Sequence, residues 1–110
     1  MATLPPEIAA SINLLRNQCL AIINLATESE WQLFTQLGET TESLVFLAEL
    51  STVALEATDA FTRLNNLQLK VAGSQPRMSS ALSILILEYR DRIEIRIPAW
   101  QRSIEEILSN

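Results

Sequence analysis

Residues 8–26, IAASINLLRNQCLAIINLA, carry apolar side chains at alternating steps of four and three positions. The residues in this series are Ile8, Ile12, Leu15, Cys19, Ile22 and Ala26. Such steps place the side chains along one face of an α-helix, where they can pack against a partner helix. Prolines at positions 5 and 6 suit the first turn, because the N–H groups there have no partner within the helix. This stretch therefore predicts a helix over residues 5–26 with one buried face.

A second helix is expected to follow after a tight turn. Thr27 and Glu30 have the spacing of a capping box, which predicts a helix over residues 28–50. Its apolar seam would consist of Phe34, Leu37, Thr41, Leu44 and Ala48. A single helix over residues 28–71 would be roughly 66 Å long, whereas a compact globule of this size has a radius of gyration of about 13 Å. We therefore expect a break near Ser51 and a third helix over residues 52–71.

The last predicted helix covers residues 79–108, after a loop signal at residues 73–76. Its seam consists of Leu82, Ile86, Tyr89, Ile93, Ile97, Trp100, Ile104 and Ile107. Ile84 and Ile95 project onto the opposite face. Pro98 removes a backbone hydrogen bond, which predicts a kink or a short break at residues 95–97. The fold class is therefore all-α, an antiparallel helical bundle of three to four helices that forms one domain over residues 1–110.

Composition excludes several classes of function. Thirteen acidic residues against 8 basic ones give a net charge of −5, which argues against nucleic-acid binding. The chain has no histidine, so it lacks the commonest general base and zinc ligand, and its one cysteine cannot form an internal disulfide. We expect no enzymatic activity, no metal and no cofactor. No basic leader and no run of roughly 18 uncharged residues is present, so we expect a cytoplasmic protein that does not bind membranes.

Three features have alternative interpretations. Cys19 is interpreted as a small buried side chain, with a redox thiol as the alternative. The arginines of the last helix could bind an acidic segment of a partner, but the acidic residues between them favour ion pairs within the helix. These arginines are Arg90, Arg92, Arg96 and Arg102. Apolar residues beyond the seams could widen the core, form a homodimer interface or line a groove for a partner helix. These surplus residues are Leu14, Leu25, Ile84, Leu87 and Ile95.

Parts of the chain resemble the FliT-type flagellar export chaperones. The segments that carry the resemblance are LL at 14–15, IINLATESEWQL at 22–33, LV at 44–45, ILEYRDRI at 86–93 and IEEIL at 104–108. The first two are similar to that family's first helix pair, in which a helix ending in Leu-x-x-Ala is followed by a turn, an acidic residue and Trp. The last three are similar to its long third helix. The resemblance covers about half of the chain.

The resemblance implies a small cytoplasmic bundle that binds the C-terminal segment of the flagellar filament-cap protein. Binding would prevent premature assembly of this client and bring it to the export gate; members of the family can also act on the flagellar master regulator. By position, the implied partner-binding residues are Leu37, Leu44, Ile86, Tyr89, Ile93 and Trp100. Two alternatives remain open: a structural, self-associating helical bundle, and a regulatory adaptor that binds a transcription factor without touching DNA.

Overall fold

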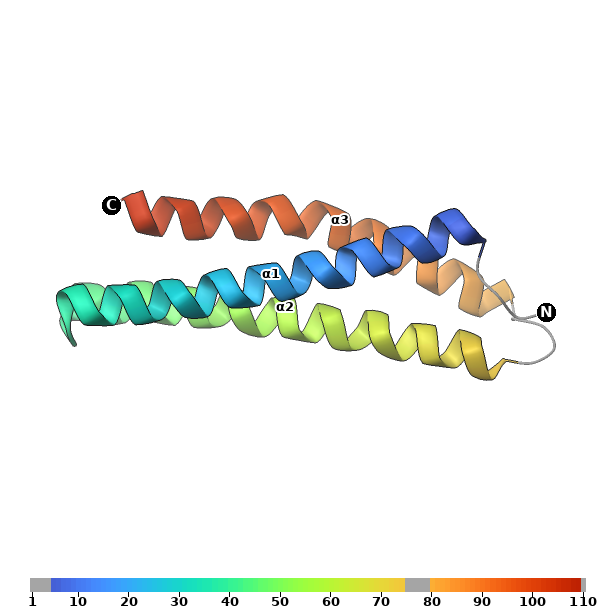
Figure 1. Cartoon of the computed structure of the whole chain (residues 1–110), viewed down its shortest axis with the longest axis horizontal. Helices are drawn as coiled ribbons and strands as arrows, with labels where there is room; N and C mark the ends of the chain where they lie inside the picture. Colours follow the sequence, from blue (N-terminus) through green and yellow to red (C-terminus); the bar gives the residue numbers. More distant parts are fainter. Residues whose placement is uncertain (1–4, 75–79, 110) are drawn as a thin grey trace.

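The part of the chain that the structure describes folds into three long helices. The computed structural model describes residues 5–74 and 80–109, and these residues contain no strand. The helices are α1 (Pro6–Leu37), α2 (Thr41–Gly73) and α3 (Ser80–Ser109). In Figure 1, α1 runs from right to left, α2 returns to the right and α3 runs to the left again. The prediction of an all-helical fold is confirmed, with three helices rather than four.

The first helix continues through the position where we expected it to end. The hydroxyl of Thr27 donates to the carbonyl oxygens of Ile23 (2.9 Å) and Asn24 (3.1 Å) and caps no helix. The buried face also continues, because Ser29 and Leu33 follow Ala26 at steps of three and four. The predicted boundary at residues 26–28 is therefore wrong: an exposed threonine satisfies its hydroxyl inside a helix without interrupting it.

The turn between α1 and α2 lies at residues 38–40. Gly38 has a φ of 65° and a ψ of −157°, a backbone conformation that is essentially restricted to glycine. Thr40 caps α2: its hydroxyl accepts from the N–H of Ser43 (3.0 Å), and its own N–H donates to the Ser43 hydroxyl (2.8 Å). The Ser43 hydroxyl also donates to the carbonyl oxygen of Gly38 (2.6 Å). This turn resets the helical phase, so the seam predicted across it is wrong.

The second helix has no break near Ser51. Leu50, Val53 and Ala57 are all buried, so one apolar face passes straight through this region. The expected break rested on a compact shape, whereas the molecule measures 56 × 19 × 18 Å and has a radius of gyration of 17.1 Å. A 33-residue helix, about 50 Å long at 1.5 Å per residue, fits along the longest axis without interruption.

The third helix buries the face that the sequence predicted. Its buried residues are Ile86, Ile93, Ile97, Trp100, Ile104 and Ile107, and Leu82 and Tyr89 pack against this core in part. Ile84 and Ile95 are exposed on the opposite face, as predicted. The helix is continuous across Pro98, so the short break considered there is absent. Residues 75–76 of the predicted loop and the predicted start at residue 79 lie outside the described residues.

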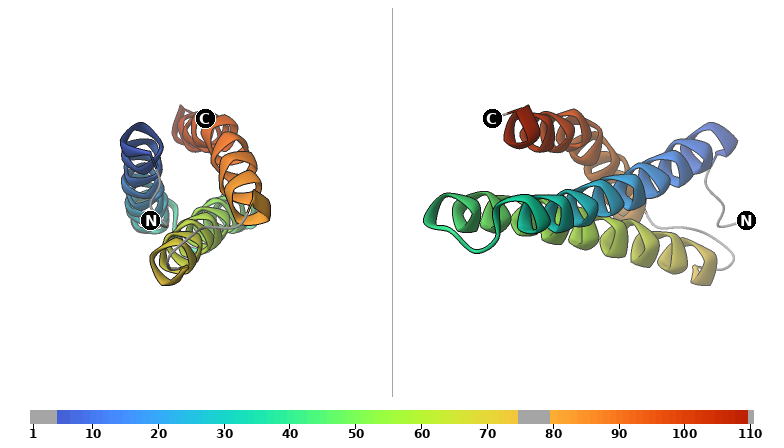
Figure 2. Two further views of the ribbon diagram at one scale, coloured as in Figure 1. Left: turned by 90° about the vertical axis from the view of Figure 1, so that its right-hand side faces the viewer. Right: turned by 60° about the vertical axis from the view of Figure 1, so that its left-hand side comes forward.

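One apolar core joins the three helices. Seen from one end, the helices lie near the corners of a triangle (Figure 2, left). The contact between α1 and α2 is the most extensive of the three, and that between α2 and α3 is the least extensive. Side chains from all three helices fill the core, so a partner can reach only the outer faces of the bundle and the grooves between helices.

Among the described residues, α1 is the one helix that is long and apolar enough to cross a membrane by length and composition. An 18-residue window of α1 has a mean hydropathy of 1.2 and at most two charged residues, enough to cross a membrane. Core helices of soluble proteins and signal sequences pass the same test. A search for uninterrupted uncharged segments does not detect this helix, because each charged residue ends a segment. The described residues bury one face of this helix, from Ile12 to Leu33, in the core.

Candidate functional site

The six residues predicted to bind a partner do not share one surface. Two lie near the α1–α2 turn and are exposed: Leu37 and Leu44. Three are buried in the core: Ile86, Ile93 and Trp100. Tyr89 is half-buried between α2 and α3. The positions implied by the resemblance therefore include three core positions of α3.

Three of the six nevertheless meet in a groove between α2 and α3. Tyr89, Ile93 and Trp100 line a hollow of about 230 Å³. The other residues around it are Glu56, Asp59, Ala60, Arg63, Arg92 and Arg96. A second hollow of about 220 Å³ shares Arg63 and Tyr89 with the first and is also lined by Asn66, Leu67, Lys70 and Leu85. We call these two adjoining hollows the α2/α3 groove.

Positive charge is in excess along the α2/α3 groove. Its four basic residues are Arg63, Lys70, Arg92 and Arg96, and its two acidic ones are Glu56 and Asp59. Arg96 is bound by Glu56, with its Nη2 atom 2.7 and 2.9 Å from the two carboxylate oxygens. Among the described residues, Arg92 forms no ion pair. An acidic partner would therefore find unpaired positive charge here, although the whole chain has a net charge of −5.

Aromatic rings form the floor of the α2/α3 groove. The guanidinium of Arg63 lies 5.9 Å from the ring centre of Tyr89, and that of Arg96 lies 5.4 Å from the ring of Trp100. The Nε1 atom of Trp100 is buried without a hydrogen-bond partner among the described residues. A buried unpaired donor costs about 1–3 kcal/mol. An acceptor that reached this N–H would recover that cost.

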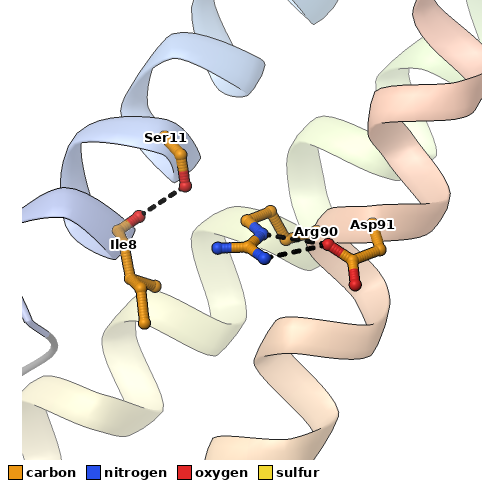
Figure 3. Close-up of polar contacts among 4 residues, drawn as sticks. All are labelled: Ile8, Ser11, Arg90 and Asp91. Atoms are coloured by element: carbon orange, nitrogen blue, oxygen red, sulfur yellow. Dashed lines mark hydrogen bonds and ion pairs between the residues drawn. The ribbon is translucent and has the colours of Figure 1, made fainter.

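The arginines of α3 are used in different ways. Arg90 pairs with its neighbour Asp91 at 3.0 Å (Figure 3). The same figure shows the first turns of α1, where the Ser11 hydroxyl donates to the carbonyl oxygen of Ile8. Arg96 pairs across helices with Glu56. The expected ion pairs within the helix are thus found for Arg90 alone among the described residues. An exposed pair of this kind contributes little to stability.

A second apolar surface lies at the α1–α2 turn and was not predicted as a site. Trp31 is 69% exposed, and its ring stacks on Phe34 with a distance of 6.3 Å between ring centres. These rings line a hollow of about 410 Å³ together with Thr27, Glu30 and Leu47. The signal in the sequence was a pair of aromatic residues three positions apart, with Trp31 off the predicted seam and Phe34 on it.

Carboxylates and the single cysteine are the side chains of this sequence that could bind a metal ion or act as a thiol. The described residues contain no group of three or more His, Cys, Asp or Glu that could hold a metal ion. Cys19 is fully buried in the core, and burial raises the pKa of its thiol to about 11. This placement agrees with a small buried side chain.

We expect Cys19 to be unreactive in the folded protein. The thiolate is the nucleophile, and burial both excludes reagent and keeps the thiol protonated near neutral pH. The release of a chromophore from an aromatic disulfide reagent should be slow in native buffer and immediate in denaturant. Equally fast modification in both conditions would contradict a buried Cys19.

Comparisons with models of protein families, with curated proteins and with solved structures find no match to this chain. The FliT-type resemblance therefore remains an expectation from the sequence. The function is therefore inferred from the residues and geometry of the α2/α3 groove and of the apolar surface around Trp31 and Phe34.

Proposed function

We propose that this protein is a cytoplasmic export chaperone that holds an unfolded or amphipathic helical segment of a flagellar client in the α2/α3 groove. The observation that carries the proposal is the combination of aromatic floor and unpaired positive charge along this groove. A client helix needs an apolar surface to cover its own apolar face, and charged groups at the rim fix its register. No catalytic group is required for this activity.

The apolar and the acidic side chains of such a segment would contact different residues of the groove. Apolar side chains of the client would lie on Tyr89, Leu85 and Leu67. Its carboxylates would pair with Arg63 and Arg92, since guanidinium groups bind carboxylates through two parallel hydrogen bonds. The client under the FliT-type resemblance is the C-terminal segment of the filament-cap protein, kept from assembling before export.

We further propose that the three helices act as an antiparallel bundle in which α3 bends at Pro98. A proline cannot donate a backbone hydrogen bond to the residue four positions earlier, here Glu94, so bending at this point costs little. The α2–α3 contact is also the least extensive in the bundle. Movement of α3 would then widen the groove and let a client reach the edges of Ile93 and Trp100.

Titration with the filament-cap segment tests the proposal. We expect a defined complex by size-exclusion chromatography with light scattering, at concentrations up to about 100 μM and thus well above a micromolar affinity of about −8 kcal/mol. Arg92→Glu should weaken binding roughly tenfold, because it places a like charge against the client's carboxylates. Arg102→Glu is the matched control, since Arg102 is an exposed arginine of α3 outside the groove.

Two results would contradict the proposal. The first is the absence of a complex at about 100 μM, well above the concentration that a micromolar affinity requires. The second is an equal loss of binding in both arginine variants, which would indicate a non-specific charge effect. A stable oligomer of the protein alone would instead favour the self-associating alternative. The large number of exposed apolar side chains supports that alternative. These include Leu14, Leu55, Leu69 and Ile84.

A further inference from the structure

Charge is distributed very unevenly along the bundle. Residues 17–62 contain seven carboxylates and no lysine or arginine. They form the second half of α1, the turn and the first half of α2, which lie together at the left end of the molecule in Figure 1. The carboxylates nearest the turn belong to Glu28, Glu30, Glu39, Glu42 and Glu49. This end of the α1–α2 pair is therefore purely acidic, whereas the α2/α3 groove has excess positive charge.

An apolar surface lies within this acidic end. Trp31 and Phe34 stack on each other beside Leu47, around the hollow of about 410 Å³. Leu44 lies one turn before Leu47 on α2 and is exposed. We call Trp31, Phe34, Leu44 and Leu47 the turn-end platform. On α1 the exposed Leu20 and the half-buried Ile23 extend the apolar side chains toward the N-terminus of the helix. From residue 20 to residue 34 this surface extends over about 21 Å, or four helical turns.

We infer that the turn-end platform binds a cationic amphipathic helix of another protein. Together with Leu20 and Ile23 the platform spans four helical turns, a length that fits the apolar face of such a helix. The carboxylates around it supply the complementary charge, and Glu30 itself lines the hollow. Aromatic anchors such as Trp31 commonly carry much of the energy of an interface.

The same charges disfavour three other occupants. A second copy placed face to face would bring the acidic ends of two α1–α2 pairs together, which is repulsive. Anionic lipid surfaces and nucleic acids would be repelled in the same way. Burial raises the pKa of the Glu30 carboxyl, and a lysine or arginine brought beside it would lower that pKa again. The inference does not rest on the proposed function, because it concerns another groove with the opposite charge.

Two synthetic peptides test the charge preference. Both contain about 15 residues, long enough for about four turns, and share one helical pattern of leucines; lysines occupy the polar positions in the first and glutamates in the second. Binding to the full-length protein is followed by anisotropy of a labelled peptide. We expect the lysine peptide to bind roughly tenfold more tightly or better, and to weaken when salt rises from about 0.05 to about 0.5 M. Equal affinities, or no binding of the lysine peptide, would overturn the inference.

Substitutions at two exposed positions test whether the peptide binds at the turn-end platform. Trp31→Ala should weaken binding of the lysine peptide roughly tenfold. Ile95→Ala removes a side chain that is 73% exposed on the outer face of α3, and it should change the affinity less than twofold. Both variants should keep their helical circular dichroism, since neither residue belongs to the core. Equal binding by Trp31→Ala and the unaltered protein would overturn the location.

Two further measurements exclude the other occupants. Light scattering of the protein alone should give one mass over a wide concentration range. A dimer that Trp31→Ala abolishes would overturn the inference in favour of a second copy. Vesicles of neutral and of anionic phospholipid should leave the protein in solution; cosedimentation that depends on Trp31 would assign the platform to a membrane instead. Arg92→Glu should leave peptide binding unchanged, so failure of the α2/α3 proposal and failure of this inference are distinguishable.

Discussion

Replacing Thr52 by proline is expected to destabilise the protein by about 3 kcal/mol or more. Thr52 is exposed within α2, so no core contact is lost. Proline removes the backbone N–H that bonds four residues back, and its ring clashes with the carbonyl of Ala48, which also accepts the Thr52 hydroxyl at 3.0 Å. Urea unfolding followed by circular dichroism measures the change in the free energy of unfolding.

Thr41→Pro is the matched control on the same helix. Thr41 is the first residue of α2, where proline is favoured because the N–H has no partner within the helix. The preceding Thr40 has a φ of −114° and a ψ of 164°, the extended conformation that a following proline requires. We expect a change below about 1 kcal/mol. Equal tolerance of both prolines would instead support a helix start near Ser51 and contradict a continuous α2.

The apolar seams could be predicted from the sequence, but the ends of the helices could not. Steps of three and four identified the core face of α1 from Ile12 to Ala26 and that of α3 from Ile86 to Ile107, and both faces are buried. The true N-cap at Thr40 was missed because its partner at the third position is Ser43, whereas the familiar capping box has a glutamate or glutamine there. Thr27 and Glu30 have the familiar form but lie inside α1.

The length of the helices was misjudged because a globular shape was assumed. Compactness is an average property of domains, and nothing in the sequence near Ser51 requires α2 to end. The apolar side chains of Leu50 and Val53 continue the same face on either side. In such a case the continuous seam is better evidence than the expected size of the molecule, because burial of that seam stabilises the helix directly.

The candidate grooves could be predicted only in part. Tyr89, Ile93 and Trp100 were implied as binding residues by the resemblance, and their spacing also placed them on one face of the last helix. The pairing of Arg63 with Tyr89 joins positions 26 residues apart on different helices, which no local pattern reveals. Trp31 was visible as an aromatic side chain off the seam, but its exposure depends on where α3 packs. Surface grooves depend on the phase between helices, and the turn at residues 38–40 sets that phase for α1 and α2.

Ile104→Ala is expected to destabilise the protein by about 2–5 kcal/mol. Ile104 is 0% exposed and belongs to the core face of α3, between the buried Trp100 and Ile107. The variant loses the transfer free energy of the removed carbon atoms and leaves a cavity that rigid neighbouring helices cannot fill completely. Urea unfolding should show a lower midpoint at an unchanged slope, because the surface exposed on unfolding stays nearly the same.

Ile95→Ala removes the same atoms from the other face of the same helix. Ile95 is 73% exposed, so we expect a change within about 0.5 kcal/mol. The two isoleucines lie nine positions apart, which corresponds to two and a half turns and therefore to opposite faces. The pair thus measures which apolar face of α3 forms the core. If Ile95→Ala proved the more destabilising, α3 would pack through its other face, and Tyr89, Ile93 and Trp100 would become available to a partner.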